Sequence, residues 1–275
     1  MKYFFVVAAV LAVVNSHAQI EPLTLEPDGG NKKASVSEQI GIVKVSINYN
    51  RPGVKGREGK IWNTSVAHYG FTDLGHGTTH TAPWRAGANE NTTIEFTTDV
   101  KVEGRTLSAG KYGFFVAYDP SECTLIFSKN STSWGNFFYD STEDALRVKV
   151  KPGTTDKSVE WLKYEFTEQT SSSATIQLQW EKVTIPFRVD VDVIKMQLAS
   201  FRKELRGGVA LPGYWQPWNE AAGYCLANNT NLEEALLWAD SATSKTFGGT
   251  RNFEPGKPRL PFSIASDVKQ RERRL

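Results

Sequence analysis

The sequence predicts a mainly β protein: an antiparallel β-sandwich, jelly-roll-like in character, followed by a short α-helical C-terminal segment. Between residues 42 and 193, short runs of alternating apolar and polar residues are separated by turn signals such as Lys151-Pro152-Gly153. No stretch with helical spacing interrupts these runs, so the strands are expected to connect through hairpins rather than crossover helices. After residue 193 the apolar residues change to helical spacing.

The first 18 residues have the pattern of a secretory signal peptide. Lys2 precedes an apolar run from Tyr3 to Val14, and the small residues Ser16 and Ala18 follow it. We therefore expect cleavage near Ala18 and an exported protein, periplasmic or extracellular. The run is short for a membrane span, so stable membrane insertion is not expected after processing. Residues 19–33 contain Pro and Gly and are predicted to form a leader loop.

The β-sandwich domain is predicted over residues 34–193. In the first clear run, apolar and polar residues alternate, which is the pattern of a strand with one buried face; the apolar residues are Val43, Val45, Ile47 and Tyr49. The same period recurs over residues 92–98, 111–118, 123–129, 145–151, 161–168, 174–181 and 183–193. About nine short strands are expected in all. Pro186 lies inside the last run and cannot donate a ladder hydrogen bond, which predicts an edge strand or a bulge there.

The helical segment is predicted over residues 194–246. Its first helix has apolar residues at helical spacing: Ile194, Leu198, Phe201 and Leu205. Residues 214–242 resemble one tetratricopeptide-type helix pair, with Asn231 as the candidate N-cap of the second helix. Because a single pair cannot bury its own apolar stripe, we expect it to pack on the sandwich, on a second copy or on a partner.

The remaining residues, 247–275, lose all periodicity and are rich in Pro, Lys and Arg. They are predicted to form a basic, disordered tail.

Composition narrows the classes of partner. The 275 residues include 32 Lys and Arg and 30 Asp and Glu, a formal net charge of +2. Because the positive and negative charges are nearly equal, the composition gives no sign of a basic surface that would bind nucleic acid. Cys123 and Cys225 are the only cysteines, and we expect two buried thiols rather than a disulfide framework.

Catalytic motifs are absent from the sequence: it has no phosphate-binding loop, no dinucleotide fingerprint and no nucleophile elbow. No catalytic residue, metal ligand or cofactor is therefore assigned. One alternative stays open. His68, His76 and His80 lie close in sequence. In a metal-assisted hydrolase, His76, His80 and a third ligand from His68, Asp73 or Glu90 would hold zinc, and zinc-bound water would be the nucleophile.

Two stretches combine arginine, aromatic and glycine residues: YNRPGVKGR at 49–57 and WRAGANE at 84–90. Arginine can clamp a carboxylate or phosphate through two hydrogen bonds, and an indole can stack on a sugar. The predicted ligand-binding residues are Tyr49, Arg51, Arg57, Trp84, Arg85, Asn89 and Glu90. The alternative interpretation is a loop brace, in which Arg51, Arg57 or Arg85 pairs with Glu90, Trp84 fills the end of the sandwich and Gly87 adopts a positive φ.

Five motifs occur together and in order: the two stretches above, GRTLSAGKYG at 104–113, DALRVKVKP at 144–152 and EWLKYEF at 160–166. With them, residues 34–193 resemble an exported bacterial family catalogued as domain of unknown function 2911. The helix pair at 214–242 is similar to what often follows that domain. Members tend to continue into further helices, whereas this chain departs from that pattern after Phe253. The resemblance implies a fold and a compartment, but no reaction.

These observations predict an exported, non-catalytic binding or envelope-associated module. Loops held by a rigid sheet would recognise a glycan, a peptide or an envelope protein. A second alternative to the hydrolase is a structural scaffold that acts through the C-terminal helices.

Overall fold

The computed structural model describes residues 30–75, 77, 81–244, 246, 267, 268, 270 and 271. The predicted signal peptide, most of the predicted leader loop, His76 and His80, and most of the predicted tail lie outside these residues.

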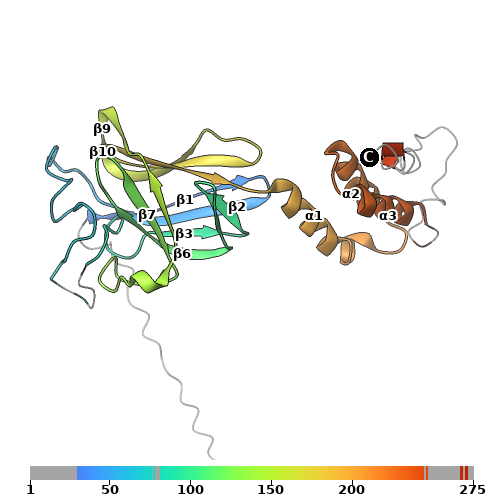
Figure 1. Ribbon diagram of the computed structural model, residues 1–275, viewed down its shortest axis with the longest axis horizontal. Helices are drawn as coiled ribbons and strands as arrows, with labels where there is room; N and C mark the ends of the chain where they lie inside the picture. The colour runs from blue at the N-terminus through green and yellow to red at the C-terminus, as the bar shows by residue number, and fades with distance from the viewer. Residues whose placement is uncertain are drawn as a thin grey trace, which may run out of the picture.

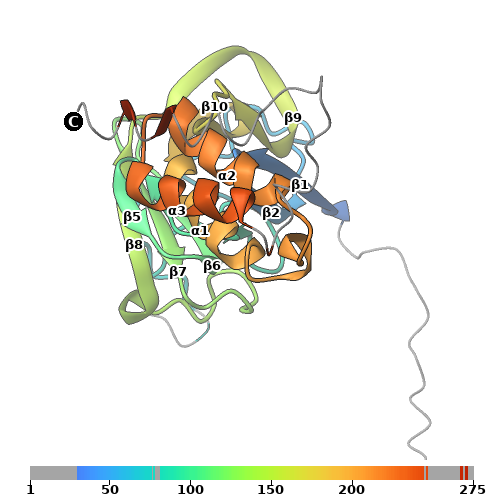
Figure 2. The same cartoon turned by 90° about the vertical axis from the view of Figure 1, so that its right-hand side faces the viewer.

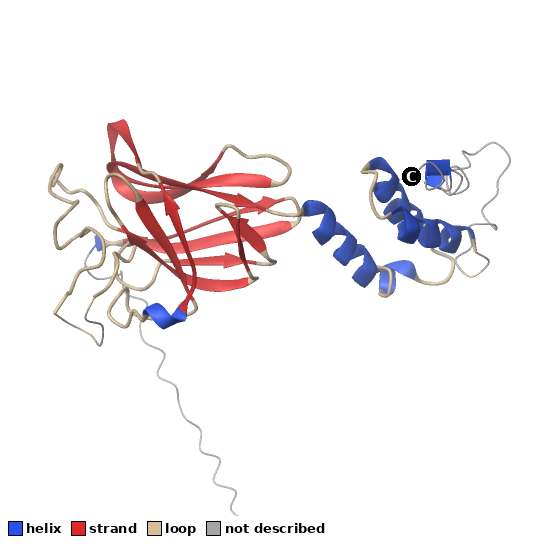
Figure 3. Cartoon of the chain, in the orientation of Figure 1, coloured by secondary structure: helices blue, strands red, loops and turns tan. Residues whose placement is uncertain are grey.

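The described chain folds into two antiparallel sheets followed by helices, which confirms the predicted fold class (Figure 1, Figure 3). The six-stranded sheet has, in spatial order, β1 (Lys32–Ile40), β2 (Val43–Arg51), β3 (Thr93–Phe96), β6 (Gly110–Ala117), β7 (Cys123–Ser128) and β8 (Asp144–Val150). The four-stranded sheet has β5 (Arg105–Leu107), β4 (Val100–Val102), β10 (Ser173–Asp190) and β9 (Gly153–Thr167). A short 3-10 helix, η2 (Ser141–Glu143), precedes β8.

The main core lies between the two sheets and follows the predicted alternation. On β2, Val43, Val45 and Ile47 are fully buried while Asn48 is exposed. The largest fully buried side chain, Trp180, comes from β10 of the opposite sheet. Pleating sends alternate residues to opposite faces, so Lys44, Ser46 and Asn48 of β2 point away from this core.

One side of the sandwich is joined by backbone contacts between the sheets. Residues after β2 reach β9, where Gly53 bridges Trp161 and Val54 N–H donates to the carbonyl of Glu160 at 2.8 Å. These bonds fix the start of the long loop that follows β2.

Three predicted strand details differ in the structure. Strand β1 begins at Lys32, inside the predicted leader loop, and its few apolar residues gave no clear alternation. The runs 174–181 and 183–193 form one strand, β10, with bulges on either side of Glu181. Strand β10 has neighbours on both sides, so an edge position for Pro186 is wrong. Pro186 instead stands between the end of the β9 ladder at Thr184 and the β4 ladder at Val189.

The helices leave the sandwich at the end of β10, opposite the long loops (Figure 1, Figure 2). They are α1 (Val193–Glu204), η3 (Gly208–Ala210), α2 (Gln216–Ala227) and α3 (Leu232–Thr243). The α2–α3 pair packs against the rest of its own segment, through Leu198 and Leu205 of the α1 region. Asn231 does not cap α3 with its side chain. It donates from Nδ2 to Glu234, which also pairs with Arg202 of α1 at 2.7 Å.

Four residues of the predicted disordered tail are described; all four are helical, and of these Val268 is buried while Asp267, Gln270 and Arg271 are exposed. Val268 is fully buried in the helical cluster, and the Arg271 guanidinium donates to the carbonyl of Leu226. Within the part of the chain that the structure describes, no helix has the length and apolarity needed to cross a membrane.

Cys123 and Cys225 are free and buried in separate clusters, as predicted. Burial raises the pKa of Cys123 to about 11 and also raises the pKa of Cys225. Both thiols therefore act as small apolar side chains at neutral pH.

Candidate functional site

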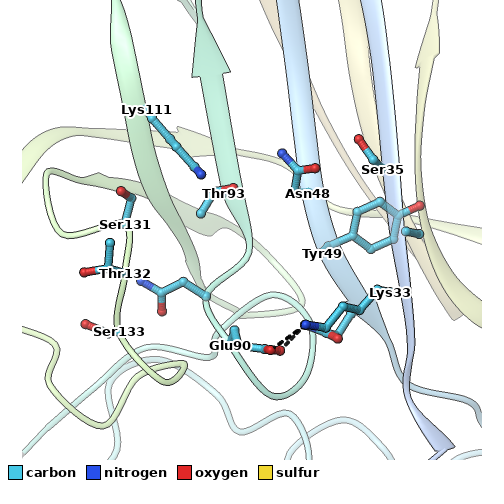
Figure 4. A pocket seen from close by; sticks show the side chains of 13 residues that line it. Lys33, Ser35, Asn48, Tyr49, Glu90, Thr93, Lys111, Ser131, Thr132 and Ser133 are labelled. Carbon is cyan, nitrogen blue, oxygen red and sulfur yellow. Dashed lines mark hydrogen bonds and ion pairs between the residues drawn. The ribbon is translucent and has the colours of Figure 1, made fainter. Parts of the chain in front are cut away.

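An open hollow of about 650 Å³, lined mainly by polar residues, lies on the outer face of the six-stranded sheet (Figure 4). Its floor comes from β1, β2, β3 and β6, and its walls from the loops around residues 90 and 132. The lining residues are Lys33, Ala34, Ser35, Asn48, Tyr49, Asn50, Glu90, Asn91, Thr93, Lys111, Ser131, Thr132 and Ser133.

Strand register builds the floor of this hollow. Ser35 of β1 pairs with Asn48 of β2, Asn48 pairs with Thr93 of β3, and Thr93 pairs with Gly113 of β6. Directly paired residues point to the same face of a sheet. Four strands therefore place one row of small polar positions side by side, although the residues span 79 positions of sequence from 35 to 113.

Gly113 allows the wall to approach the sheet. A Cβ atom at this position would lie 2.2 Å from the carbonyl oxygen of Asn130, which is closer than any real contact. The neighbouring half of the outer face, over β6 and β7, is covered instead by an apolar cluster that includes Phe115, Ile126 and Tyr139. The hollow is thus the part of this face that the loops leave uncovered.

Glu90 is the charged centre of one wall. Its carboxylate accepts from Lys33 Nζ at 2.8 Å and from Asn50 Nδ2 at 2.8 Å. The hydrogen bond from Lys33 is the largest of the causes that lower the pKa of Glu90, so this carboxylate is ionised at neutral pH. The Lys33 and Glu90 side chains are 65% and 41% exposed, so the ion pair contributes little to stability.

Two buried amides in the lining each leave their oxygen without a partner. Asn50 Nδ2 donates to Glu90 and Asn91 Nδ2 donates to the carbonyl of Asn130. A carboxylate and a carbonyl can only accept, so the orientation of both amides is fixed. Asn50 Oδ1 and Asn91 Oδ1 have no hydrogen-bond partner among the described residues, although the two residues are only 4% and 7% exposed. A buried amide oxygen without a donor costs about 1–3 kcal/mol.

The structure brings two of the predicted ligand-binding residues, Tyr49 and Glu90, to the hollow. Asn89 precedes Glu90 but is not in the lining, and its side-chain oxygen accepts from Asn31 Nδ2 at 3.2 Å. Tyr49 is 7% exposed and packs edge-on against Tyr164, and its hydroxyl accepts from the Tyr164 N–H. Tyr49 therefore serves mainly as core beneath the site.

Arg51 and Arg57 lie outside the lining and bond to backbone carbonyls. Arg51 Nε donates to the carbonyl of Leu162 at 2.8 Å, which ties the end of β2 to β9. Arg57 donates to the carbonyls of Gly53 and Val54, four and three residues before it. Both guanidinium groups hold the loop after β2, but neither pairs with Glu90, whose ion pair is with Lys33, so the predicted arginine–Glu90 pair is wrong.

Trp84 belongs to the main core. It is 2% exposed, its ring stacks on Trp180 with centroids 6.0 Å apart, and its backbone exchanges two hydrogen bonds with Val116. Gly87 does not have a positive φ; that conformation falls on Ala86 and Asn89. Glycine is needed at 87 for close approach, because a Cβ atom there would lie 2.6 Å from Thr92 Oγ1.

Arg85 joins two loops. Its guanidinium donates to the carbonyl of Asn89 at 3.0 Å and to Asn136 Oδ1 at 2.8 Å, and it lies over the Phe137 ring. Burial lowers the pKa of Arg85, but an arginine stays charged in proteins. The ligand-binding role of all seven predicted residues stays a prediction, while the contacts of Arg51, Arg57, Trp84 and Arg85 are those of a brace.

Sequence reasoning missed most of the lining. Lys33, Ser35, Asn48, Thr93 and Lys111 are outward residues of strands, and an outward polar residue looks the same whether it faces solvent or a site. The 131–133 wall also gave no motif. Its one available signal was the run Asn130-Ser131-Thr132-Ser133, a cluster of hydrogen-bonding side chains after a strand.

His68 is the described member of the predicted histidine cluster. It is 8% exposed, and neither ring nitrogen has a hydrogen-bond partner of acceptable geometry among the described residues. Burial, the largest cause, and the Arg85 charge lower the pKa of His68, while the Tyr69 backbone partly opposes this. His68 is therefore a neutral imidazole in the folded protein at pH 7.

We expect His68 to make the protein acid-sensitive. In the unfolded chain a histidine has a pKa of about 6.5, and in the folded chain the His68 pKa is lower. Below about pH 6.5 the unfolded state binds a proton that the folded state does not, so folding becomes less favourable as the pH falls. Urea unfolding at pH 7 and pH 5 should show a smaller loss for His68→Leu than for wild type. Equal losses in both proteins would contradict this assignment.

The zinc hypothesis is not tested by these contacts. Among the described residues there is no group of three or more His, Cys, Asp or Glu that could hold a metal, but His76 and His80 are not among them. Asp73, a further candidate ligand, accepts from the Gly75 N–H within its own turn.

Comparisons with known proteins identify a family but not a function. No curated protein matches the chain. No solved structure matches it either. The family described as "Protein of unknown function (DUF2911)" matches residues 31–189, which is more than half of the chain and spans β1 to β10 up to its penultimate residue. This protein therefore belongs to the DUF2911 family.

Proposed function

We propose that this protein is a non-catalytic binding module whose outer-face hollow binds a hydroxyl-rich ligand, namely a glycan. The observation that carries the proposal is the lining itself: hydroxyls, amides and ammonium groups from four strands and two loops. Each sugar hydroxyl donates one hydrogen bond and accepts others. Such a ligand matches a site in which donors and acceptors alternate over a short distance.

A glycan fits this floor better than an extended peptide does. Peptides that add to a sheet bind through the unpaired backbone of an edge strand. The floor here is centred on β2 and β3, whose backbones pair with neighbours on both sides. Recognition therefore falls to side chains, and the exposed ones are short and polar, such as Ser35 and Asn48.

The lining supports binding without hydrolysis. Glycoside hydrolysis uses two carboxyl groups on opposite sides of the scissile bond. Glu90 is the single carboxylate among the described residues that line the hollow, and Lys33 already pairs with it. An ionised, paired carboxylate is poorly suited to act as the general acid.

The test uses two paired sets of substitutions on the same sheet face. Ser35→Ala with Asn48→Ala removes one directly paired set from the floor, and Ser37→Ala with Ser46→Ala removes the next directly paired set outside the lining. We expect the first double variant to lose roughly tenfold in affinity for a bound oligosaccharide, since two hydrogen bonds contribute about 1–3 kcal/mol together.

The measurement is a screen of neutral and acidic oligosaccharides followed by calorimetric titration of the best binder. The control double variant should bind like wild type. If both double variants bind equally well, or if no oligosaccharide binds at millimolar concentration, the glycan-binding function is wrong.

We also propose that the protein acts outside the cytoplasm. The support is the N-terminal pattern of Lys2, the apolar run and the small residues before Gln19. Protein recovered from its native host should begin at or near Gln19 when its N-terminus is sequenced. A mature chain that retains Met1 or Lys2 would contradict export by cleavage.

A further inference from the structure

The charged residues in the hollow indicate which class of sugar it prefers. This inference rests on the proposed glycan-binding function. Three charged residues line the hollow: Lys33, Glu90 and Lys111. Lys33 and Glu90 form an ion pair at 2.8 Å. Lys111 lies on the other side of the hollow, on β6, with its side chain directed toward Thr93 (Figure 4).

Lys111 is the charged lining residue that forms no ion pair among the described residues. Its direct cross-strand neighbour on the same face is Glu95 of β3, yet within the described residues no ion pair joins Lys111 to Glu95 or to any other carboxylate. With Lys33 and Glu90 cancelling each other, the described lining has a net charge of +1 from Lys111. An anionic group on the ligand would therefore find its partner at this end of the hollow.

The chemistry around Lys111 suits a carboxylate. The donors on this side are one ammonium group and the hydroxyls of Thr93, Ser131 and Thr132 (Figure 4). Doubly charged phosphate groups are usually held by arginine forks or by several backbone N–H groups. Neither arginine nor a helix start is present among the described lining residues.

We propose that the hollow prefers an acidic saccharide of the uronic acid type, with its carboxylate at Lys111 and its hydroxyls over Ser35 and Asn48. The ammonium supplies the selectivity for charge, while the amide and hydroxyl floor supplies the affinity that a neutral analogue would share. The preference should weaken as salt concentration rises, because the Lys111 side chain is exposed.

The experiment compares ligands that differ only in charge. Trimers of galacturonate, glucuronate and mannuronate are each titrated beside their fully methyl-esterified forms. A trimer of neutral sugars that carries sulfate groups serves as a second kind of anion. Wild type should bind at least one acidic trimer roughly fivefold more tightly than its ester, the effect of one partly exposed ion pair. Raising NaCl to about 0.5 M should reduce this ratio.

Substitution of Lys111 then assigns the preference. Lys111→Gln should bind acid and ester equally, with ester affinity unchanged, and Lys111→Arg should restore the preference. Lys44→Gln removes an exposed lysine from the same sheet face outside the lining and should behave like wild type.

Each of the remaining experimental outcomes would contradict a specific part of this proposal. If acid and ester bind wild type equally, or if Lys111→Gln keeps the preference, the acidic preference is wrong and the glycan site stands. If the sulfated trimer is preferred over every uronate, the carboxylate assignment is wrong. If none of the trimers binds at millimolar concentration, both this inference and the proposed function fail.

Discussion

Trp84→Ala should lower the free energy of unfolding by about 3–5 kcal/mol, the usual cost of deleting a large buried aromatic side chain. Trp84 is 2% exposed and contacts two other indoles, Trp180 and Trp62, with ring centroids 6.0 and 5.3 Å away. Alanine would leave a cavity that these rigid rings cannot fill. Chemical denaturation followed by far-UV circular dichroism measures the loss.

Two further substitutions separate packing from other effects. Trp134 is 51% exposed, so Trp134→Ala should change the free energy of unfolding by less than about 0.5 kcal/mol. The Trp84 indole N–H is buried without a partner among the described residues. Trp84→Phe removes that unsatisfied donor and leaves a smaller cavity, so it should cost clearly less than Trp84→Ala. A Trp84→Ala protein as stable as wild type would show that Trp84 is not part of the core.

Arg85→Ala should cost about 2–3 kcal/mol, because it removes charge-assisted hydrogen bonds and leaves their acceptors unpaired. Asn136 is 3% exposed and its Nδ2 already donates to the carbonyl of Pro83, so its Oδ1 would have no donor left. The carbonyl of Asn89 would also lose its partner, and Asn89 adjoins Glu90 in the wall of the hollow. Ligand affinity should therefore fall although Arg85 is outside the lining.

Matched arginine variants test this assignment. Arg85→Lys keeps the charge but not the planar fork, so it should recover less than half of the lost stability. Arg206 is exposed, and Arg206→Ala should be close to neutral. If Arg85→Ala retains wild-type stability and loses only ligand affinity, Arg85 acts on the ligand directly and the brace interpretation is wrong.

The bracing residues and the residues that line the hollow therefore have different roles. Arg51, Arg57, Trp84 and Arg85 use their chemistry on the protein itself, through backbone carbonyls, Asn136 and the Trp180 ring. Rigid loops then hold the walls of a hollow whose own residues are short and polar. The sequence stretches rich in arginine and tryptophan therefore supply mainly the residues that support the hollow, not the residues that line it.

The alternation of Val43, Val45, Ile47 and Tyr49 was enough to predict β2 and its buried face, because the pleat alone decides which side chains share a side. The same reasoning found α1 from its helical spacing. It failed for β1, where Ala34 and Val36 are the only apolar residues before Ile40 and a neighbouring strand supplies the stability. It also divided β10 at Glu181, because a bulge with positive φ at that residue resembles a turn in sequence.

Local sequence thus determined the fold class of this protein, since periodicity and turn chemistry act over a few residues. The tertiary structure alone decided the hollow, because its floor exists only when register aligns Ser35, Asn48 and Thr93 across three strands. It also decided which charges form ion pairs: Lys33 pairs with Glu90 across 57 residues of sequence, while Lys111 forms no ion pair among the described residues. Charge pairing depends on distance in space, and spacing along a β chain does not fix that distance.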